Sequence, residues 1–109
     1  MSIDLPPPID LYLRIENSGD VQALAECFAF NARVRDERQT CEGLAAITQW
    51  LAKTKKKYRH TIAPLGVTHH DGTTVLEAQL TGNFPGSPVT MQFSFVLESG
   101  KIASLEIHG

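Results

Sequence analysis

The fold is decided by residues 89–107, which read VTMQFSFVLESGKIASLEI. Apolar and polar residues alternate along this stretch, and residues two apart point to the same side of a β-strand. The apolar face of the first strand consists of Val89, Met91, Phe93, Phe95 and Leu97. The turn at Ser99-Gly100 leads into a second strand of the same kind. The stretch therefore predicts two antiparallel strands with one apolar face.

Two further strands are predicted before this pair. Residues 61–69 contain Pro64 and Gly66, which fit poorly in a central ladder and predict a bulge or an edge strand. Asp71-Gly72 is typical of a hairpin turn, and an alternating strand follows it up to Thr81. Because no helical pattern interrupts these strands, residues 61–107 are predicted to form an antiparallel meander.

The first half of the chain has helical spacing of apolar residues. Helices are predicted over residues 8–16, over residues 20–28, and from Thr40 or Glu42 to Tyr58. Residues 30–36 alternate instead, which places Asp36 on one face with Phe30, Ala32 and Val34. The chain is thus predicted to be one α+β domain over residues 1–109, with residues 1–6 as a loose arm. Its three N-terminal helices should cover one side of a strongly curved, mostly antiparallel sheet, which gives a cone.

Composition argues against several classes of protein. The chain has 10 Lys and Arg against 12 Asp and Glu, so it has no positive field to attract nucleic acid or an anionic membrane. The basic segment 53–59 is accounted for by the negative end of a helix dipole. No apolar run is long enough for a membrane helix, and residues 1–8 lack an export signal. A cytoplasmic location is expected, with Cys27 and Cys41 as reduced thiols.

Several short motifs together resemble a known superfamily. They are Tyr12, Ser18-Gly19-Asp20, the run from Phe28 to Asp36, the run from Glu42 to Ile47 before Trp50, and the run from Gly100 to Ile107. In this order they resemble the nuclear transport factor two-like superfamily, in its SnoaL-like and ketosteroid-isomerase-like branch, over residues 8–108. The resemblance implies a cone-shaped, commonly dimeric fold with a deep pocket and no metal or organic cofactor. It does not imply one reaction.

Asp36 and Tyr12 are the predicted catalytic residues. They stand where the steroid isomerases, which this chain resembles, have a general base and a phenol donor, but Met91-Gln92-Phe93 offers no second acid. Independently of the resemblance, a carboxylate on an apolar strand face loses hydration, which raises its pKa toward the range useful for proton abstraction. The alternative is that Asp36 is solvated or paired with Arg35, Arg38 or His60, and that Tyr12 is an ordinary core residue.

The remaining ligand-pocket residues are predicted from their positions: Trp50, His60, Phe28, Val34, Met91 and Phe93. His60 is also a candidate second proton carrier, whereas His69-His70 is expected to face water and bind no metal. Two functions stay open. The chain is either a cofactor-free acid-base catalyst for a small apolar carbonyl compound, or a non-catalytic ligand-binding or dimerisation module. A second copy is expected to dock on the outer, Thr- and Gln-rich face of the sheet.

Overall fold

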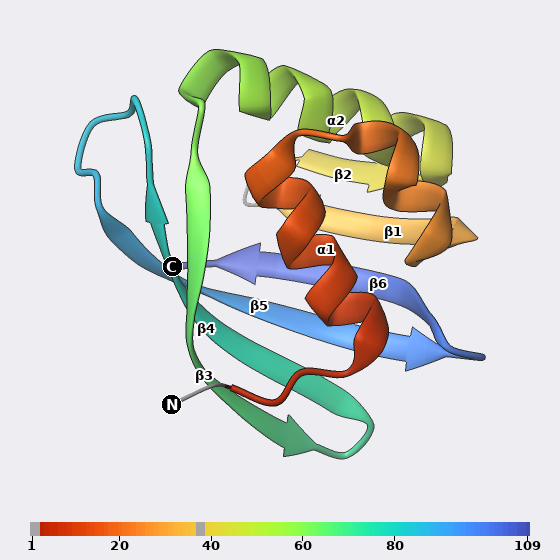
Figure 1. Cartoon of the computed structure of the whole chain (residues 1–109). Coiled ribbons are helices and arrows are strands. Elements are labelled where there is room, and N and C mark those ends of the chain that lie inside the picture. Colours follow the sequence, from red (N-terminus) through yellow and green to blue (C-terminus); the bar gives the residue numbers. More distant parts are fainter. Residues whose placement is uncertain (1–2, 37–38) are drawn as a thin grey trace.

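A computed structural model describes residues 3–36 and 39–109 of the chain. These residues form a six-stranded sheet in the order β2-β1-β6-β5-β4-β3 (Figure 1). The strands are β1 (Phe28–Asp36), β2 (Gln39–Glu42), β3 (Thr61–His70), β4 (Thr73–Thr81), β5 (Val89–Glu98) and β6 (Lys101–His108). Neighbouring strands are antiparallel except for β1 and β6, which are parallel. The predicted α+β class and mostly antiparallel curved sheet are confirmed.

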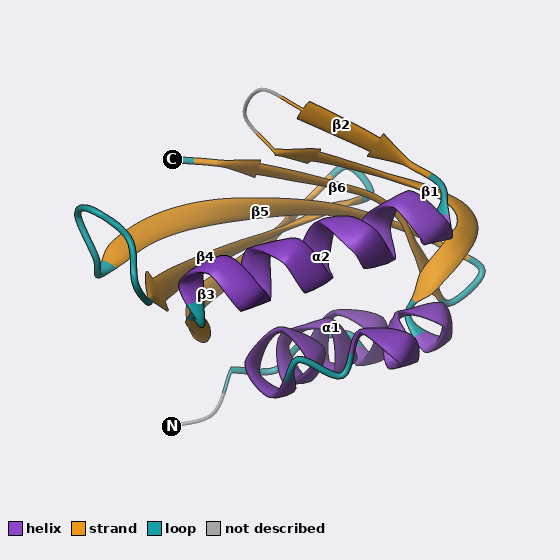
Figure 2. Cartoon of the chain, turned by 90° about the horizontal axis from the view of Figure 1, so that it is seen from above, coloured by secondary structure: helices purple, strands orange, loops and turns teal. Residues whose placement is uncertain are grey.

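The helices lie on one face of this sheet, as Figure 2 shows. They are α1 (Pro7–Ser18), the 3₁₀ helix η1 (Val21–Glu26) and α2 (Leu44–Tyr58). The prediction that the second helix reaches Phe28 is wrong, because η1 ends at Glu26 and Phe28 begins β1. None of the helices in the described part of the chain is long and apolar enough to cross a membrane. Residues 3–6 precede α1 without regular structure, and residues 1–2 of the predicted arm lie outside the described residues.

The third helix starts later than predicted. Thr40 and Glu42 do not open it, because residues 39–42 pair as β2 with the end of β1. Gly43 then turns the chain with φ 90° and ψ 154°, a backbone conformation that residues with a Cβ rarely adopt. Its N–H donates to Ala32 O at 2.7 Å. The glycine therefore joins the edge strand directly to the start of α2 at Leu44.

The prediction for Phe30 is wrong as well. This residue is 86% exposed, although Ala32 and Val34, which were expected on the same apolar face, are buried. The reason is an irregularity in the β1–β6 ladder. While β1 advances from Phe28 to Arg33, β6 advances only from Ile102 to Ser104, so the alternation is interrupted between them. The irregularity predicted for β3 is confirmed, since its register shifts between Pro64 and Gly66 at the edge of the sheet.

The core lies between the helices and the concave face of the sheet. Tyr12 of α1 is at its centre and packs edge-on against Phe28 and Phe95, with ring centroids 5.7 and 5.8 Å apart. The free thiol of Cys27 is buried in the same cluster, and that of Cys41 is half-buried. Burial raises the pKa of the Cys27 thiol to about 12.

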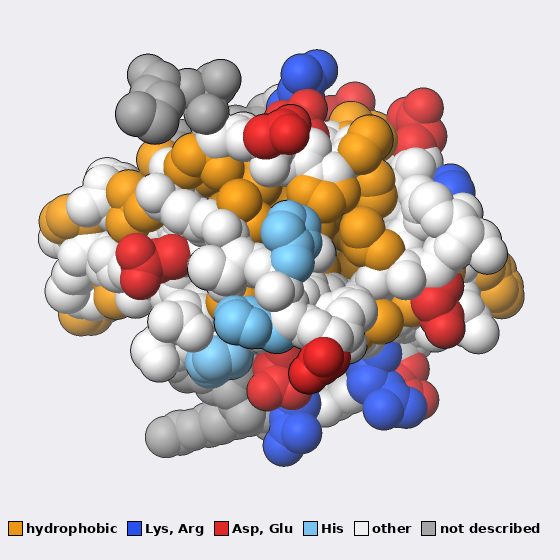
Figure 3. All heavy atoms as spheres, turned by 90° about the horizontal axis from the view of Figure 1, so that it is seen from below, with side chains coloured by type: hydrophobic (Ala, Val, Ile, Leu, Met, Phe, Trp, Pro, Cys, Tyr) orange, Lys and Arg blue, Asp and Glu red, His pale blue; other side chains and the backbone are white. Residues whose placement is uncertain are grey.

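The underside of the molecule, in the orientation of Figure 1, includes β3 and β4. Hydrophobic side chains gather there beside histidine side chains, with charged side chains mostly toward the borders (Figure 3). His69 and His70 are exposed on β3, as expected, and His69 Nδ1 lies 3.1 Å from Thr74 Oγ1. Docking of a second copy on the outer face of the sheet stays a prediction.

Candidate functional site

A cavity of about 450 Å³ opens between the C-terminal half of α2, the start of β3, the β4–β5 loop, the start of β5 and the ends of β1 and β6. This volume is within the range of small-molecule sites. Most of the lining residues are apolar: Trp50, Tyr58, Leu80, Phe84, Pro85, Val89, Met91, Phe93 and Ile107. The others are Glu16, Asp36, Thr54, His60, Gly86 and Gly109. The cavity thus combines an apolar wall with two carboxylates and an imidazole.

Strand register explains how one carboxylate reaches this wall. Asp36 is the Cα partner of Ile107 on β6, and Ile107 is the partner of Phe93 on β5. Directly opposed residues on neighbouring strands present their side chains to the same face of a sheet. The half-buried Asp36 therefore ends a row of large apolar side chains, and all three residues line the cavity.

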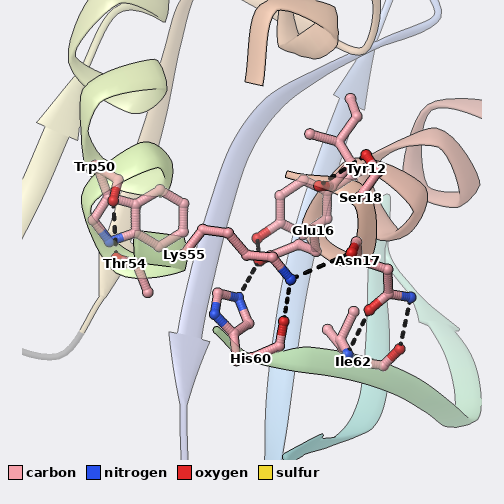
Figure 4. A network of polar contacts seen from close by, with 10 residues as sticks. Tyr12, Glu16, Asn17, Ser18, Trp50, Thr54, Lys55, His60 and Ile62 are labelled. Atoms are coloured by element: carbon pink, nitrogen blue, oxygen red, sulfur yellow. Dashed lines mark hydrogen bonds and ion pairs between the residues drawn. The ribbon is translucent and has the colours of Figure 1, made fainter. Parts of the chain in front are cut away.

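The second carboxylate belongs to a buried polar network, drawn in Figure 4. Glu16 of α1 and His60, just before β3, are each 3% exposed, and Glu16 Oε1 lies 2.5 Å from His60 Nε2. The Tyr12 hydroxyl donates a short hydrogen bond to Glu16 Oε2. Lys55 Nζ donates to the backbone oxygens of His60 and Asn17. Two segments far apart in the sequence are thereby joined beside the cavity.

The electrostatics keep the Tyr12 phenol protonated. Burial, and next the negative charge of Glu16, raise the pKa of Tyr12 well above its ordinary value. The negative charge of Asp36 adds to this rise in pKa. The phenol consequently acts as a hydrogen-bond donor toward Glu16.

Two buried nitrogen atoms of the cavity-lining residues have no hydrogen-bond partner within the described part of the chain. They are the indole Nε1 of Trp50, which is 7% exposed, and Nδ1 of His60. Buried polar atoms are nearly always hydrogen-bonded, and each exception requires an explanation. A bound molecule with a suitable acceptor and donor would provide one.

The C-terminal end of α2 and the β4–β5 loop pack closely against each other at Gly82. Asn83 N donates to Tyr58 O at 2.7 Å. A Cβ on Gly82 would lie 2.9 Å from both His60 Cα and Tyr58 O, closer than real Cβ atoms come to such atoms. Glycine is therefore required at this position, because the backbones on both sides leave no room for a side chain.

A family model of the SnoaL-like domain matches residues 9–105. The chain belongs to the SnoaL-like domain family. Among solved structures, a candidate polyketide cyclase from Sinorhizobium meliloti is 38% identical, with a TM-score of 0.92 and 96% of each chain covered. A comparison with curated proteins gives no match.

Two more distant structures share the fold of this SnoaL-like domain. A protein of ketosteroid isomerase-like fold from Catenulispora acidiphila, in complex with trimethylamine, is 18% identical with a TM-score of 0.84, covering 97% of this chain and 87% of its own. A candidate SnoaL-like polyketide cyclase from Jannaschia is 21% identical with a TM-score of 0.74, covering 97% and 90%. The resemblance identified from the sequence is therefore confirmed at the level of family and fold.

Five of the site residues predicted from the sequence of this SnoaL-like domain line the cavity: Asp36, Trp50, His60, Met91 and Phe93. Tyr12, Phe28 and Val34 are not among its lining residues. Each of them is fully buried in the core, where Phe28 packs against Tyr12 and Val34 pairs with Leu105 beneath the helices. Gln92 is exposed, with Phe93 facing the opposite, buried side of β5.

Sequence reasoning missed Glu16. It lies four residues after Tyr12, so both fall on the apolar face of α1. A carboxylate one turn from a core tyrosine is the signal that could have identified it. The alternative in which Asp36 pairs with Arg38 concerns a residue outside the described ones. Asp36 does have an interaction partner of its own.

Proposed function

We propose that this SnoaL-like domain binds a small, largely apolar carbonyl compound and moves a proton next to the carbonyl group without a cofactor. The observation that carries the proposal is the apolar cavity with Asp36 and His60 on its wall. Both side chains exchange protons in enzymes that act near neutral pH. The name of the 38% identical Sinorhizobium meliloti protein, a candidate polyketide cyclase, agrees with a cyclisation of this kind.

In this proposal Asp36 takes the proton. Its position at the end of a row of apolar side chains provides partial desolvation, which favours proton abstraction. The negative charge that develops on the carbonyl oxygen needs a hydrogen-bond donor. The sequence assigns this role to Tyr12, and that assignment stays a prediction. The Tyr12 hydroxyl already donates to Glu16, which supports giving the role to the indole N–H of Trp50, for which the described residues provide no acceptor.

The experiment is hydrogen–deuterium exchange at the carbon next to the carbonyl. Cyclic ketones and β-diketones are first screened by thermal shift, and each compound that binds is incubated with the protein in D₂O and followed by NMR. Wild-type protein should accelerate the exchange, and Asp36→Asn should lower the rate by roughly 10²–10⁴-fold while the melting temperature hardly changes. The control is Glu77→Gln, which alters an exposed carboxylate on β4.

A different outcome would favour the non-catalytic alternative. If compounds bind with clear thermal shifts but none exchanges faster than in buffer, the cavity is a binding site without chemistry. If Asp36→Asn loses much of its stability yet retains full exchange, Asp36 is structural and the proposal is wrong.

A further inference from the structure

His60 uses its two ring nitrogen atoms differently. Nε2 is 2.5 Å from Glu16 Oε1, whereas Nδ1 is buried and has no partner among the residues described. Figure 4 shows the imidazole with Nε2 toward Glu16 and the other nitrogen turned away from α1, toward the side where Trp50 lies. His60 lines the cavity, and Nδ1 is its ring nitrogen with no partner among the described residues, so Nδ1 is the nitrogen left to interact with a molecule bound there.

The hydrogen between Glu16 and His60 belongs on the imidazole. Tyr12 donates to the other oxygen of the carboxylate, so Glu16 accepts from both sides. A carboxylate is a weaker base than an imidazole. Its oxygen atoms only accept hydrogen bonds, so each group that contacts them must donate one. The partner of one ring nitrogen fixes the tautomer of a histidine. With Nε2–H directed at Glu16, Nδ1 of the neutral ring carries a bare lone pair.

We infer that Tyr12 and Glu16 are positioning residues that hold His60 as its Nε2–H tautomer, so that Nδ1 is a second proton acceptor at the cavity wall. The part of this inference that concerns catalysis rests on the proposed function. The part that concerns the tautomer rests on the buried contacts alone.

The proton balance needs no further reactant. A C–H bond next to the carbonyl breaks, its proton goes to Nδ1, and its electron pair moves onto the carbonyl oxygen as an enolate. The positive charge of the resulting imidazolium lies beside the Glu16 carboxylate, which stabilises it. Return of the proton from Nδ1 to the substrate restores the neutral ring. Each acceptor gives back the proton that it takes, so a proton removed from one atom of the substrate and returned by Nδ1 to another atom of the same enolate moves within one molecule.

The charged and titratable groups around His60 come from every element packed against it. They are Glu16 and Tyr12 of α1, Lys55 and Tyr58 of α2, and Asp36 of β1. The Lys55 ammonium group contacts the backbone oxygen of His60 rather than its ring. Among these groups, Glu16 is therefore the one that interacts directly with the imidazole.

The first test is NMR of protein labelled with ¹⁵N in the histidine rings, with the His60 signals assigned by their loss in His60→Gln. We expect a proton on Nε2 and a bare Nδ1 near neutral pH. A ring protonated on Nδ1 would overturn the inference whatever the protein catalyses. The tautomer is measured in the unmodified chain, with the variant used for assignment alone, so the result does not depend on whether any substrate is turned over.

The second test is the pH profile of the exchange reaction described above. In wild-type protein the rate should fall at acid pH, where both proton acceptors on the cavity wall, Asp36 and Nδ1 of His60, take up protons from solvent, so the comparison with the Glu16 variant isolates the part that belongs to His60. Glu16→Gln removes the charge that stabilises the imidazolium, so this fall should move to lower pH, and the rate should drop at least about tenfold. Tyr12→Phe removes the donor from the other carboxylate oxygen and so leaves more negative charge beside the imidazolium, which should move the fall in the opposite direction, to higher pH. His69→Gln, on the exposed part of β3, is the control.

The outcomes separate the two proposals. If Glu16→Gln changes neither the rate nor the pH at which the rate falls, the positioning role is wrong. Absence of exchange in the wild type contradicts the proposed function, and the NMR result then decides the tautomer independently.

Discussion

Glu16 Oε1 and His60 Nε2 lie 2.5 Å apart, although 44 residues separate them in the sequence. The contact joins α1 to the start of β3, and both residues are almost fully buried. Removing one partner of such a buried pair leaves the other with an uncompensated polar group.

Glu16→Ala should therefore lower the free energy of unfolding by about 3–5 kcal/mol. The alanine removes the hydrogen-bond partner of both His60 Nε2 and the Tyr12 hydroxyl. Glu16→Gln keeps an oxygen acceptor and should lower the free energy of unfolding by less. Urea denaturation measures both variants. Glu77→Ala, at an exposed position, should change the free energy by no more than about 0.5 kcal/mol. Equal effects of the alanine variants at positions 16 and 77 would contradict the buried network.

Two phenylalanines test the strand register. Phe95 is fully buried against Tyr12, whereas Phe30 is exposed beside the irregularity in β1. Phe95→Ala should lower the free energy of unfolding by about 3–5 kcal/mol. Phe30→Ala should change it by less than about 0.5 kcal/mol. A large effect of Phe30→Ala in dilute protein would mean that this residue is covered in the folded chain, contrary to the register described.

Gly43 tests the junction between β2 and α2. Its φ of 90° and ψ of 154° place it in a region that is essentially restricted to glycine, so Gly43→Ala should destabilise the protein by about 1–3 kcal/mol. Gly66→Ala is the matched control, since an added Cβ there meets no atom within 4 Å. Chemical denaturation of both variants provides the comparison. A neutral Gly43→Ala would show that the junction adopts another backbone conformation.

The Cys27 thiol predicts how stability changes at alkaline pH. Its pKa is about 12 in the folded chain because of burial, against 9.0 for an ordinary thiol. Between these values the folded state binds more protons than the unfolded state, so the free energy of unfolding falls as pH rises. The raised pKa of Tyr12 acts in the same direction. Denaturation at a series of pH values above 9 should show a shallower decline for Cys27→Ala than for the wild type. Equal slopes would mean that the thiol is not buried as described.

Trp50 tests the role proposed for its indole. Trp50→Phe keeps an aromatic ring on the cavity wall but removes the partnerless N–H. A carbonyl ligand found in the thermal-shift screen should therefore bind more weakly, by about 0.5–1.5 kcal/mol for one neutral hydrogen bond. Calorimetric titration measures the difference. Unchanged affinity would show that the indole N–H does not contact the ligand.

The sequence predicted those parts of the fold in which local pattern and packing agree. Alternation along residues 89–107 and the breakers at Pro64 and Gly66 correspond to the observed strands and bulge. The prediction from the sequence was wrong where pairing with another strand overrides the local pattern of residues. Residues 39–42 gain backbone hydrogen bonds from β1, and the interruption of the β1–β6 ladder turns Phe30 outward. Neither partner strand can be identified from the spacing of apolar residues.

The candidate site was predictable only in part for a similar reason. Asp36 was identified because the strand pattern placed it beside apolar residues, and His60 because it begins a strand. The contact between Glu16 and His60 depends on how α1 crosses the sheet, which no periodicity encodes. Tyr12 was found by resemblance, but its use of the hydroxyl toward Glu16 follows from a neighbour one helical turn away.

The tight approach at Gly82 limits how the cavity can differ between relatives. The β4–β5 loop, the end of α2 and the segment that carries His60 touch backbone to backbone there, so a side chain at position 82 would disturb three cavity-lining segments at once. Met91 on β5 lines the same cavity with a flexible, adaptable side chain. Relatives that select other compounds are therefore expected to differ at position 91 and to keep glycine at position 82.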